Sequence, residues 1–237
     1  MSLGLRLAPT LITIPIVLTC LGLGFWQIER LQWKRDLIAQ REAAIAAPPV
    51  APPRSLAEAR GMQFRRVFAE GVFLHDKEIY LGATSPRGGE AGFDVLTPLR
   101  EVEGHIVFVN RGFVPSRLKD PKTRSPGQLE GQVRIAGLLR LPPQEKPGPF
   151  LPENRADINY WFWVDLPAMA GADGLDNVAP FYIEADATPN PGGWPLGKVA
   201  TAELPNNHLQ YAITWFSLAT GMVVVYIVSQ RQGRRSV

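Results

Sequence analysis

The chain has 237 residues, of which 46% are hydrophobic, and a formal net charge of +3 at pH 7. This charge is too small to favour a nucleic-acid partner, and the basic residues cluster beside apolar segments, which suits anionic lipid surfaces better. The single cysteine, Cys20, excludes an internal disulfide and the Cys-x-x-Cys pair of a thiol oxidoreductase.

The first expected element, over residues 1–46, is a membrane-spanning helix with an amphipathic extension. Residues 7–28 carry no charged side chain, and these 22 residues are enough to cross a bilayer core, which takes about 20 residues of helix. No Ala-x-Ala cleavage site follows this run, so we expect an uncleaved anchor. The start of the chain has no amphipathic, Arg- and Ser-rich stretch, so a mitochondrial transit peptide is not expected.

Aromatic and basic residues continue the helical pattern beyond this span and share one face at steps of three and four. They are Trp26, Arg30, Trp33, Leu37 and Arg41. One interpretation is that the tryptophans anchor the helix at the membrane interface, beside a solvated charged face. The other is that Trp26 and Arg30 face the second span and help to form a site there.

Repeated prolines in residues 47–60 predict a linker, because proline forbids helix and favours an extended spacer. The end of this linker resembles one short helical turn. Ser55 followed by Glu58 three residues later is the pattern of a capping box.

Residues 61–203 predict a mainly antiparallel β-domain that closes toward a barrel or a sandwich. Seven strands are expected, at 64–73, 78–82, 93–99, 105–110, 133–139, 160–165 and 181–185. The first two should pair as a hairpin, and so should the third and fourth. A short helix is expected after Asp165, with Pro167 in its first turn.

The β-domain carries no recognisable catalytic motif, so we do not expect an enzyme. His75 beside Asp76 is more typical of a turn than of an acid–base pair. The segment Asn110, Arg111 and Gly112 predicts a strand end and an exposed turn, and we expect these three residues to bind a partner. Arg111 there is open to three roles: locking the loop, meeting a partner or binding a propionate.

Residues 204–230 contain no charged side chain and predict a second span. The tail at 231–237 is basic, and the positive-inside rule places it in the cytoplasm. Two spans then place the N-terminus in the cytoplasm as well, and the β-domain in the periplasm. Basic residues after the first span argue for the reverse orientation, but long loops translocate largely regardless of charge. The expected fold class is thus α+β, with two transmembrane helices flanking the β-domain.

One face of the second span starts with a histidine and continues with aromatic and small residues. It comprises His208, Tyr211, Ala212, Trp215, Ala219 and Met222. A neutral imidazole with an aromatic, apolar surrounding suits a haem iron, for which this face supplies one axial ligand. The alternative is that His208 caps the helix at the lipid headgroups, hydrogen-bonded to Asn206 or Asn207, while Trp215 packs on lipid.

Short motifs follow one another in a specific order along almost the whole chain. They are Gly24-Phe25-Trp26-Gln27 with Arg30 and Lys34, Phe64-Arg65, Gly71-x-Phe73, Thr97-Pro98-Leu99, the run from Val109 to Pro115, Pro152-x-Asn154, the run from Trp163 to Ala170, the run from Tyr182 to Ala185, and the run from Asn207 to Phe216. In this order they resemble the surfeit-locus family of cytochrome c oxidase assembly factors. The family usually has tryptophan where Phe113 stands.

The resemblance implies a two-span protein of a bacterial inner membrane that helps to mature subunit I of haem–copper oxidase. Its cargo would be haem a, brought or guarded during insertion, with His208 as the iron ligand and Tyr211, Trp215, Trp26 and Arg30 around it. Besides subunit I, haem a synthase and membrane lipids are expected partners. A haem-independent scaffold that holds subunit I remains the alternative.

Overall fold

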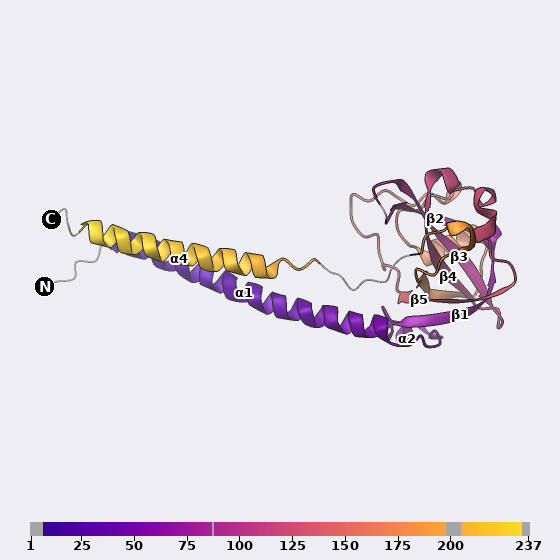
Figure 1. Cartoon of the computed structure of the whole chain (residues 1–237), viewed down its shortest axis with the longest axis horizontal. Helices are drawn as coiled ribbons and strands as arrows, with labels where there is room; N and C mark the ends of the chain where they lie inside the picture. The colour runs from indigo at the N-terminus through magenta and orange to yellow at the C-terminus, as the bar shows by residue number, and fades with distance from the viewer. Residues whose placement is uncertain (1–6, 87, 198–204, 234–237) are drawn as a thin grey trace. The chain divides into compact units, whose positions relative to one another are not determined.

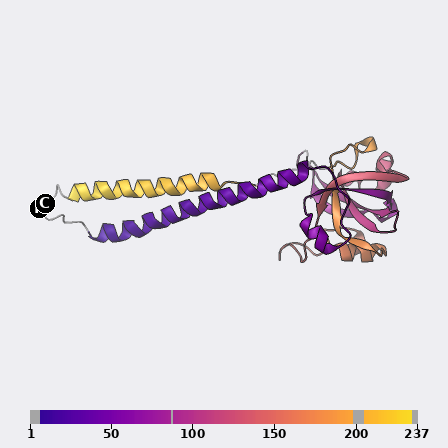
Figure 2. The same ribbon diagram turned by 90° about the horizontal axis from the view of Figure 1, so that it is seen from below.

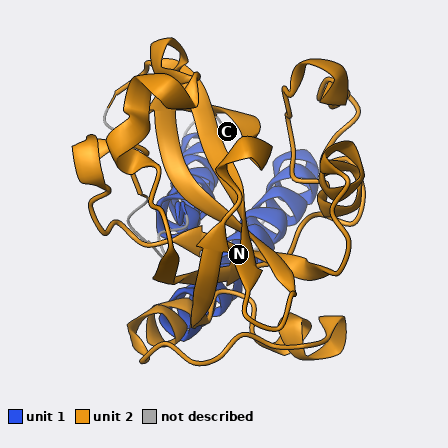
Figure 3. Cartoon of the chain, turned by 90° about the vertical axis from the view of Figure 1, so that its right-hand side faces the viewer, with its two compact units in different colours: residues 1–40, 202–237 blue, residues 41–201 orange. Residues whose placement is uncertain are grey.

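The computed structural model describes residues 7–86, 88–197 and 205–233. The predicted junction at residues 203 and 204 and the basic residues Arg234 and Arg235 lie outside this part of the chain. Two compact units form, one from residues 1–40 with 202–237 and the other from residues 41–201 (Figure 3). The first unit is helical and the second is mainly β, which confirms the predicted fold class.

Two long helices dominate the first unit, α1 (Leu7–Ala46), whose residues 41–46 fall in the second unit, and α4 (His208–Gly233). They lie side by side and run antiparallel (Figures 1 and 2). Thr10 Oγ1 lies 2.7 Å from Tyr226 Oη near one end of the pair, and Gln27 meets His208 at the other. α1 continues without a break through the predicted amphipathic extension.

Both helices are long and apolar enough to cross a membrane, and their apolar segments are only 17% and 11% buried. A core helix of a soluble protein would be mostly covered by its own chain. These exposed apolar surfaces instead suit contact with lipid. The chain therefore has two candidate membrane spans flanking a soluble domain.

Small side chains bring the two helices together. The buried positions of α1 include Cys20, Gly24 and Leu31, and those of α4 are Ala212 and Ala219, at spacings of four and seven residues. Such spacing keeps one seam facing the partner helix, and small residues allow close approach without water to drive the association. A Cβ atom on Gly24 would lie 2.7 Å from the ring of Phe216, so a larger residue at this position would have to displace that ring.

The second unit is built on six strands. They are β1 (Arg66–Phe73), β2 (Ile79–Thr84), β3 (Ala91–Glu101), β4 (Ile106–Pro115), β5 (Gln132–Arg140) and β6 (Val178–Ala185). Five of them form a closed barrel in the order β1-β5-β6-β4-β3, with β1 pairing β3 to close it, and β2 extends the sheet beyond β3. The β4–β6 pairing is parallel, and the others are antiparallel.

Short helices and turns connect the strands. They are α2 (Leu56–Gly61), α3 (Leu166–Asp173) and the 3-10 turns η1 (His75–Lys77), η2 (Ser116–Leu118), η3 (Pro121–Gly127), η4 (Ala156–Ile158) and η5 (Pro191–Gly193). The Ser55 hydroxyl accepts a hydrogen bond from the backbone N–H of Glu58, and the Asp165 carboxylate accepts one from Ala168. Both predicted N-caps are confirmed.

The barrel has an apolar interior and a second apolar cluster beside α3. Val67, Leu99, Val109, Leu139 and Ile183 are all fully buried inside it. The cluster beside α3 is centred on Phe108, Trp161 and Met169, each at most 1% exposed. A closed sheet with this filling is a rigid support for the polar groups described below.

Of the two predicted strand pairings, one is confirmed and one is wrong. The third and fourth predicted strands do pair, as β3 and β4. The first and second do not, because η1 separates them and β1 instead closes the barrel between β3 and β5. This closure joins segments far apart in sequence, which local patterns do not specify.

The stretch at 160–165 does not form the predicted strand. Only isolated bridges occur there, between Trp161 and Leu81 and between Tyr160 and Arg155. The Asn154 side chain accepts hydrogen bonds from the backbone N–H groups of Phe162 and Trp163, at 2.9 and 3.3 Å. It thus replaces a neighbouring strand, and the burial of Trp161 accounts for the apolar pattern.

Candidate functional site

A hydrogen bond between the two long helices lies at the predicted site. His208, the first residue of α4, places its Nδ1 atom 2.7 Å from Oε1 of Gln27 on α1. Both residues are half-buried. Because the spacing of Cys20, Gly24 and Leu31 turns one face of α1 toward α4, Gln27 falls on that face too.

This hydrogen bond sets the tautomer of the imidazole. A glutamine Oε1 is only an acceptor, so Nδ1 of His208 carries the proton and donates it. In the neutral imidazole, Nε2 then keeps its lone pair. Histidine ligands of metals are commonly oriented in this way, by a second group that accepts a hydrogen bond from the other ring nitrogen. His208 thus fits the chemistry of an axial haem ligand.

The remaining predicted site residues divide between the two helices. On α4, Trp215 is half-buried and Tyr211 is 55% exposed, both on the His208 side of the helix by their spacing. On α1, Trp26 is 46% exposed and contacts Arg30, whose guanidinium carbon lies 5.7 Å from the centroid of the Trp26 ring.

Gln27, rather than Trp26 or Arg30, meets His208. Arg30 lies between two tryptophan rings, because its guanidinium carbon is also 5.4 Å from the centroid of the Trp33 ring. Trp26 and Gln27 are adjacent in sequence, so they point about 100° apart around the helix. The structure therefore supports a direct role beside His208 for Gln27, which the sequence analysis missed. The sequence signal that could have identified Gln27 was the repeat of small or polar residues along the face of α1 that contacts α4.

Among the described residues, no group of three or more His, Cys, Asp or Glu side chains is arranged to hold a metal ion. A multidentate protein site for a free ion is thus not formed within that part of the chain. A haem would require less of the protein, because the porphyrin would supply four of the iron's ligands and a single imidazole could supply another.

A second polar arrangement, the buried polar cluster of Glu78, Tyr80, Arg111 and Arg124, lies inside the β-domain. The Arg124 guanidinium bonds both carboxylate oxygens of Glu78, one of them at 3.2 Å. Tyr80 donates its hydroxyl proton to the same carboxylate at 3.1 Å. Burial alone would raise the pKa of the Glu78 carboxyl, but its contacts with His75 and Arg124 outweigh that effect and lower the pKa to about 2.

Arg111 joins this cluster, and the predicted exposed turn around it does not exist. Asn110, Arg111 and Gly112 belong to β4, and Asn110 and Arg111 are 4% and 2% exposed. Gly112 has a φ of +109°, and a Cβ atom there would clash with the backbone oxygen of Leu196. Asn110 Nδ2 donates a 3.1 Å hydrogen bond to Asp94 Oδ2, and Arg111 Nη2 donates one to the backbone oxygen of Gly127, so these groups bond within the domain. These side chains therefore offer no surface to a protein partner.

His75 does not form an acid–base pair with Asp76. Its Nε2 atom lies 2.9 Å from the carbonyl oxygen of Leu129, and its Nδ1 atom faces Glu78 at 3.5 Å. These contacts fix the η1 turn against the barrel, in keeping with the turn interpretation.

The sequence matches the SURF1 family over residues 14–220. A SURF1-like protein of Monosiga brevicollis is 37% identical over 94% of this chain and 87% of that relative. The Surfeit locus protein 1 of Homo sapiens is 37% identical over 88% of this chain and 72% of that relative. A SURF1-like protein of Drosophila melanogaster is 34% identical, over 85% and 70%. The match spans both long helices and the β-domain between them, so the chain belongs to the SURF1 family, a family of assembly factors.

Proposed function

We propose that this protein assists the assembly of haem–copper oxidase by binding haem a through His208 and helping its insertion into subunit I. The observation that carries the proposal is the hydrogen bond from His208 Nδ1 to Gln27, which leaves Nε2 free to ligate iron. Family membership supports the assembly role.

The surroundings of His208 suit a bound group that is later released. Tyr211 and Trp215 follow on the same side of α4 and offer aromatic surface to a macrocycle. When bound, the haem would supply an iron atom that accepts the imidazole lone pair. Gln27 would hold the ring and its proton in place. A single protein ligand binds less tightly than two, which suits a carrier that must give up its cargo.

We place the protein in a bacterial inner membrane, with both ends in the cytoplasm and the β-domain in the periplasm. Antiparallel spans require the N-terminal end of α1 and the C-terminal end of α4 to lie on one side of the membrane. Arg231, after the apolar part of α4, favours the cytoplasm for that side. His208 would then lie at the periplasmic rim of the membrane.

The test is a comparison of haem content in cells that make haem a. Wild-type protein and His208→Ala protein are purified in nanodiscs and their absorption spectra are recorded. His105→Ala is the matched control, because this histidine lies in the β3–β4 turn of the β-domain. We expect bound haem a in the wild type and the control, and its loss in His208→Ala. Undiminished haem in His208→Ala would refute the ligand assignment.

A haem-independent scaffold for subunit I is the second candidate, favoured by the exposed stack of Trp26, Arg30 and Trp33. The two tryptophans are 46% and 54% exposed and both contact the arginine, a surface suited to another membrane protein. If this scaffold role holds, His208→Ala should capture subunit I at full strength and sustain normal oxidase levels, while Arg30→Ala should lose both. Loss of subunit I capture and of oxidase in His208→Ala, with both kept in Arg30→Ala, would rule out the scaffold role.

A further inference from the structure

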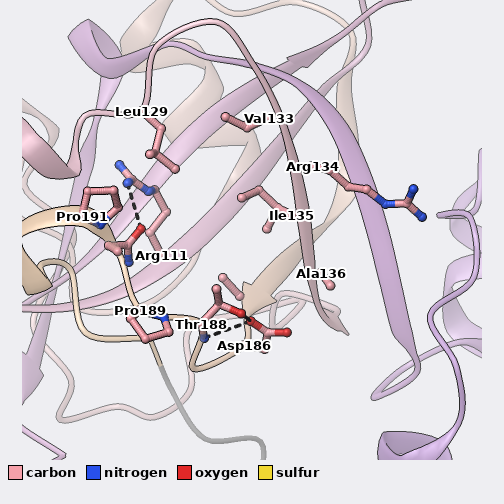
Figure 4. Close-up of a pocket in the computed structure, with 12 residues that line it drawn as sticks. Arg111, Leu129, Val133, Arg134, Ile135, Ala136, Asp186, Thr188, Pro189 and Pro191 are labelled. Atoms are coloured by element: carbon pink, nitrogen blue, oxygen red, sulfur yellow. Dashed lines mark hydrogen bonds between the residues drawn. The ribbon is translucent and has the colours of Figure 1, made fainter.

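A cavity of about 310 Å³ opens between β5 and the segment that follows β6 (Figure 4). Its walls are largely apolar, with Leu129, Val133 and Ile135 on one side and Pro189 and Pro191 on the other. Arg111 lines it and is only 2% exposed. An apolar cavity with one buried guanidinium is the usual make-up of a site for a small amphiphilic ligand.

Arg111 carries a charge that its surroundings compensate poorly. Two guanidinium groups, those of Arg111 and Arg124, face one carboxylate, Glu78. Arg124 holds both carboxylate oxygens, whereas Arg111 approaches only one of them, at 3.8 Å. The Nη1 atom of Arg111 has no hydrogen-bond acceptor within the described ranges. Its Nη2 atom donates only to neutral oxygens, those of Gly127 and Asn190.

The energetics of Arg111 agree with this geometry. Burial lowers the pKa of its guanidinium to about 10; the carboxylate of Glu78 raises it in part, and the charge of Arg124 lowers it by less than Glu78 raises it. An anion bound beside Arg111 would offset the free-energy cost of burying its positive charge.

The other charged groups of the cavity are already paired. Asp186 lies 3.4 Å from Arg66 and accepts a hydrogen bond from the backbone N–H of Thr188. Arg134 lies 3.2 Å from Glu70. The charge left over at the cavity is therefore the single positive charge of Arg111.

We propose that this cavity binds a small organic monocarboxylate, whose carboxylate meets Arg111 and whose short apolar chain lies against Leu129, Val133 and Ile135. A monoanion matches the one excess charge, whereas a phosphate would bring about two negative charges into an apolar cavity. The volume is at the small end of ligand cavities, so the chain of the ligand is short. This site is independent of His208 and of the proposed haem function.

The test is equilibrium dialysis of labelled butyrate against the full-length protein in nanodiscs, with empty nanodiscs subtracted. We expect saturable binding of one butyrate per chain, displaced by unlabelled butyrate and not by butyramide. Ala136→Phe fills the cavity from β5 without touching the buried polar cluster. Ala172→Phe, on the exposed side of α3, is its matched control. Arg111→Met removes the charge.

Binding should fall about 10- to 100-fold in Arg111→Met, the loss expected for one hydrogen-bonded charge. It should fall at least as much in Ala136→Phe and stay unchanged in Ala172→Phe. If Arg111→Met does not fold, as judged by circular dichroism, the comparison of the two alanine variants decides. No saturable binding by the wild type, equal displacement by butyramide, or full binding in Ala136→Phe would overturn the proposal.

Discussion

Replacing Gln27 by leucine tests how the helix pair prepares His208. Leucine is close to glutamine in size and remains compatible with the apolar seam, but it cannot accept the proton of His208 Nδ1. The imidazole then loses the group that fixes its orientation and tautomer. Partners of this kind typically contribute 10- to 100-fold to the affinity of a metal site. We therefore expect haem a affinity to fall by that factor, or about 1.4–2.7 kcal/mol.

The assay is an absorption titration of nanodisc-embedded protein with haem a, using Gln32→Leu as the matched control. Gln32 lies on the exposed side of the same helix, so its loss leaves the His208 contact intact. Helix content measured by circular dichroism checks that both variants fold. Wild-type affinity in Gln27→Leu, or an equal loss in Gln32→Leu, would show that the hydrogen bond does not prepare the ligand.

Three further predictions concern the buried polar cluster and the helix seam. Arg124→Met leaves the Glu78 carboxylate buried, with Arg111 as a distant cation, so denaturant titration should show that the free energy of unfolding falls by about 3–5 kcal/mol. A fall below about 1 kcal/mol would argue against a stabilising Arg124–Glu78 ion pair. The pKa of Glu78 is about 2 in the folded protein and near 4.5 in the unfolded chain. Ionised Glu78 therefore contributes about 3 kcal/mol to the free energy of unfolding above pH 4.5, and this contribution disappears as the pH falls through 2. In urea titrations between pH 6 and 2, Glu78→Gln should lack this contribution and its acid dependence. If the stability of Glu78→Gln fell with pH in parallel with that of the wild type, the assigned role of Glu78 would be wrong. Gly24→Leu should push Phe216 away and reduce haem binding at least tenfold, while Gly22→Leu, with open space at its Cβ position, should bind normally; equal binding by both would rule out the close approach.

Features encoded within a few residues could be predicted from the sequence. The two uncharged runs specify α1 and α4, and the caps at Ser55 and Asp165 mark α2 and α3. The β3–β4 pairing was predictable because a short turn joins its strands. Each of these elements depends on local propensity or on the distance that a bilayer imposes.

Features that depend on distant segments could not be predicted. β1 pairs with β5 and β3, and no local pattern names those partners. Asn110-Arg111-Gly112 has a turn composition, yet it continues a buried strand, in which Asp94 and the Gly127 carbonyl accept hydrogen bonds from Asn110 and Arg111. A charged residue can be recognised as buried from sequence only when the residue that pairs with it is already known.

The site was predictable in part for the same reason. His208 stood out as a histidine at the edge of an apolar run, and its spacing to Tyr211 and Trp215 follows from helix geometry. Its contact with Gln27 depends on the rotation of α1 against α4. That rotation is set by Gly24, Ala212 and Ala219 at the seam, and it places Trp26 on another side of the helix.

The most direct measurement of the central claim is chemical rescue of a ligand-free variant. His208→Gly protein in nanodiscs is titrated with haem a, with and without imidazole, beside the wild type. His208→Leu serves as the control, because its side chain occupies the space that imidazole would need. If His208 ligates the haem iron, His208→Gly should lose haem a binding and recover it with imidazole, while His208→Leu should not recover. Wild-type haem binding by His208→Gly in the absence of imidazole would contradict the account.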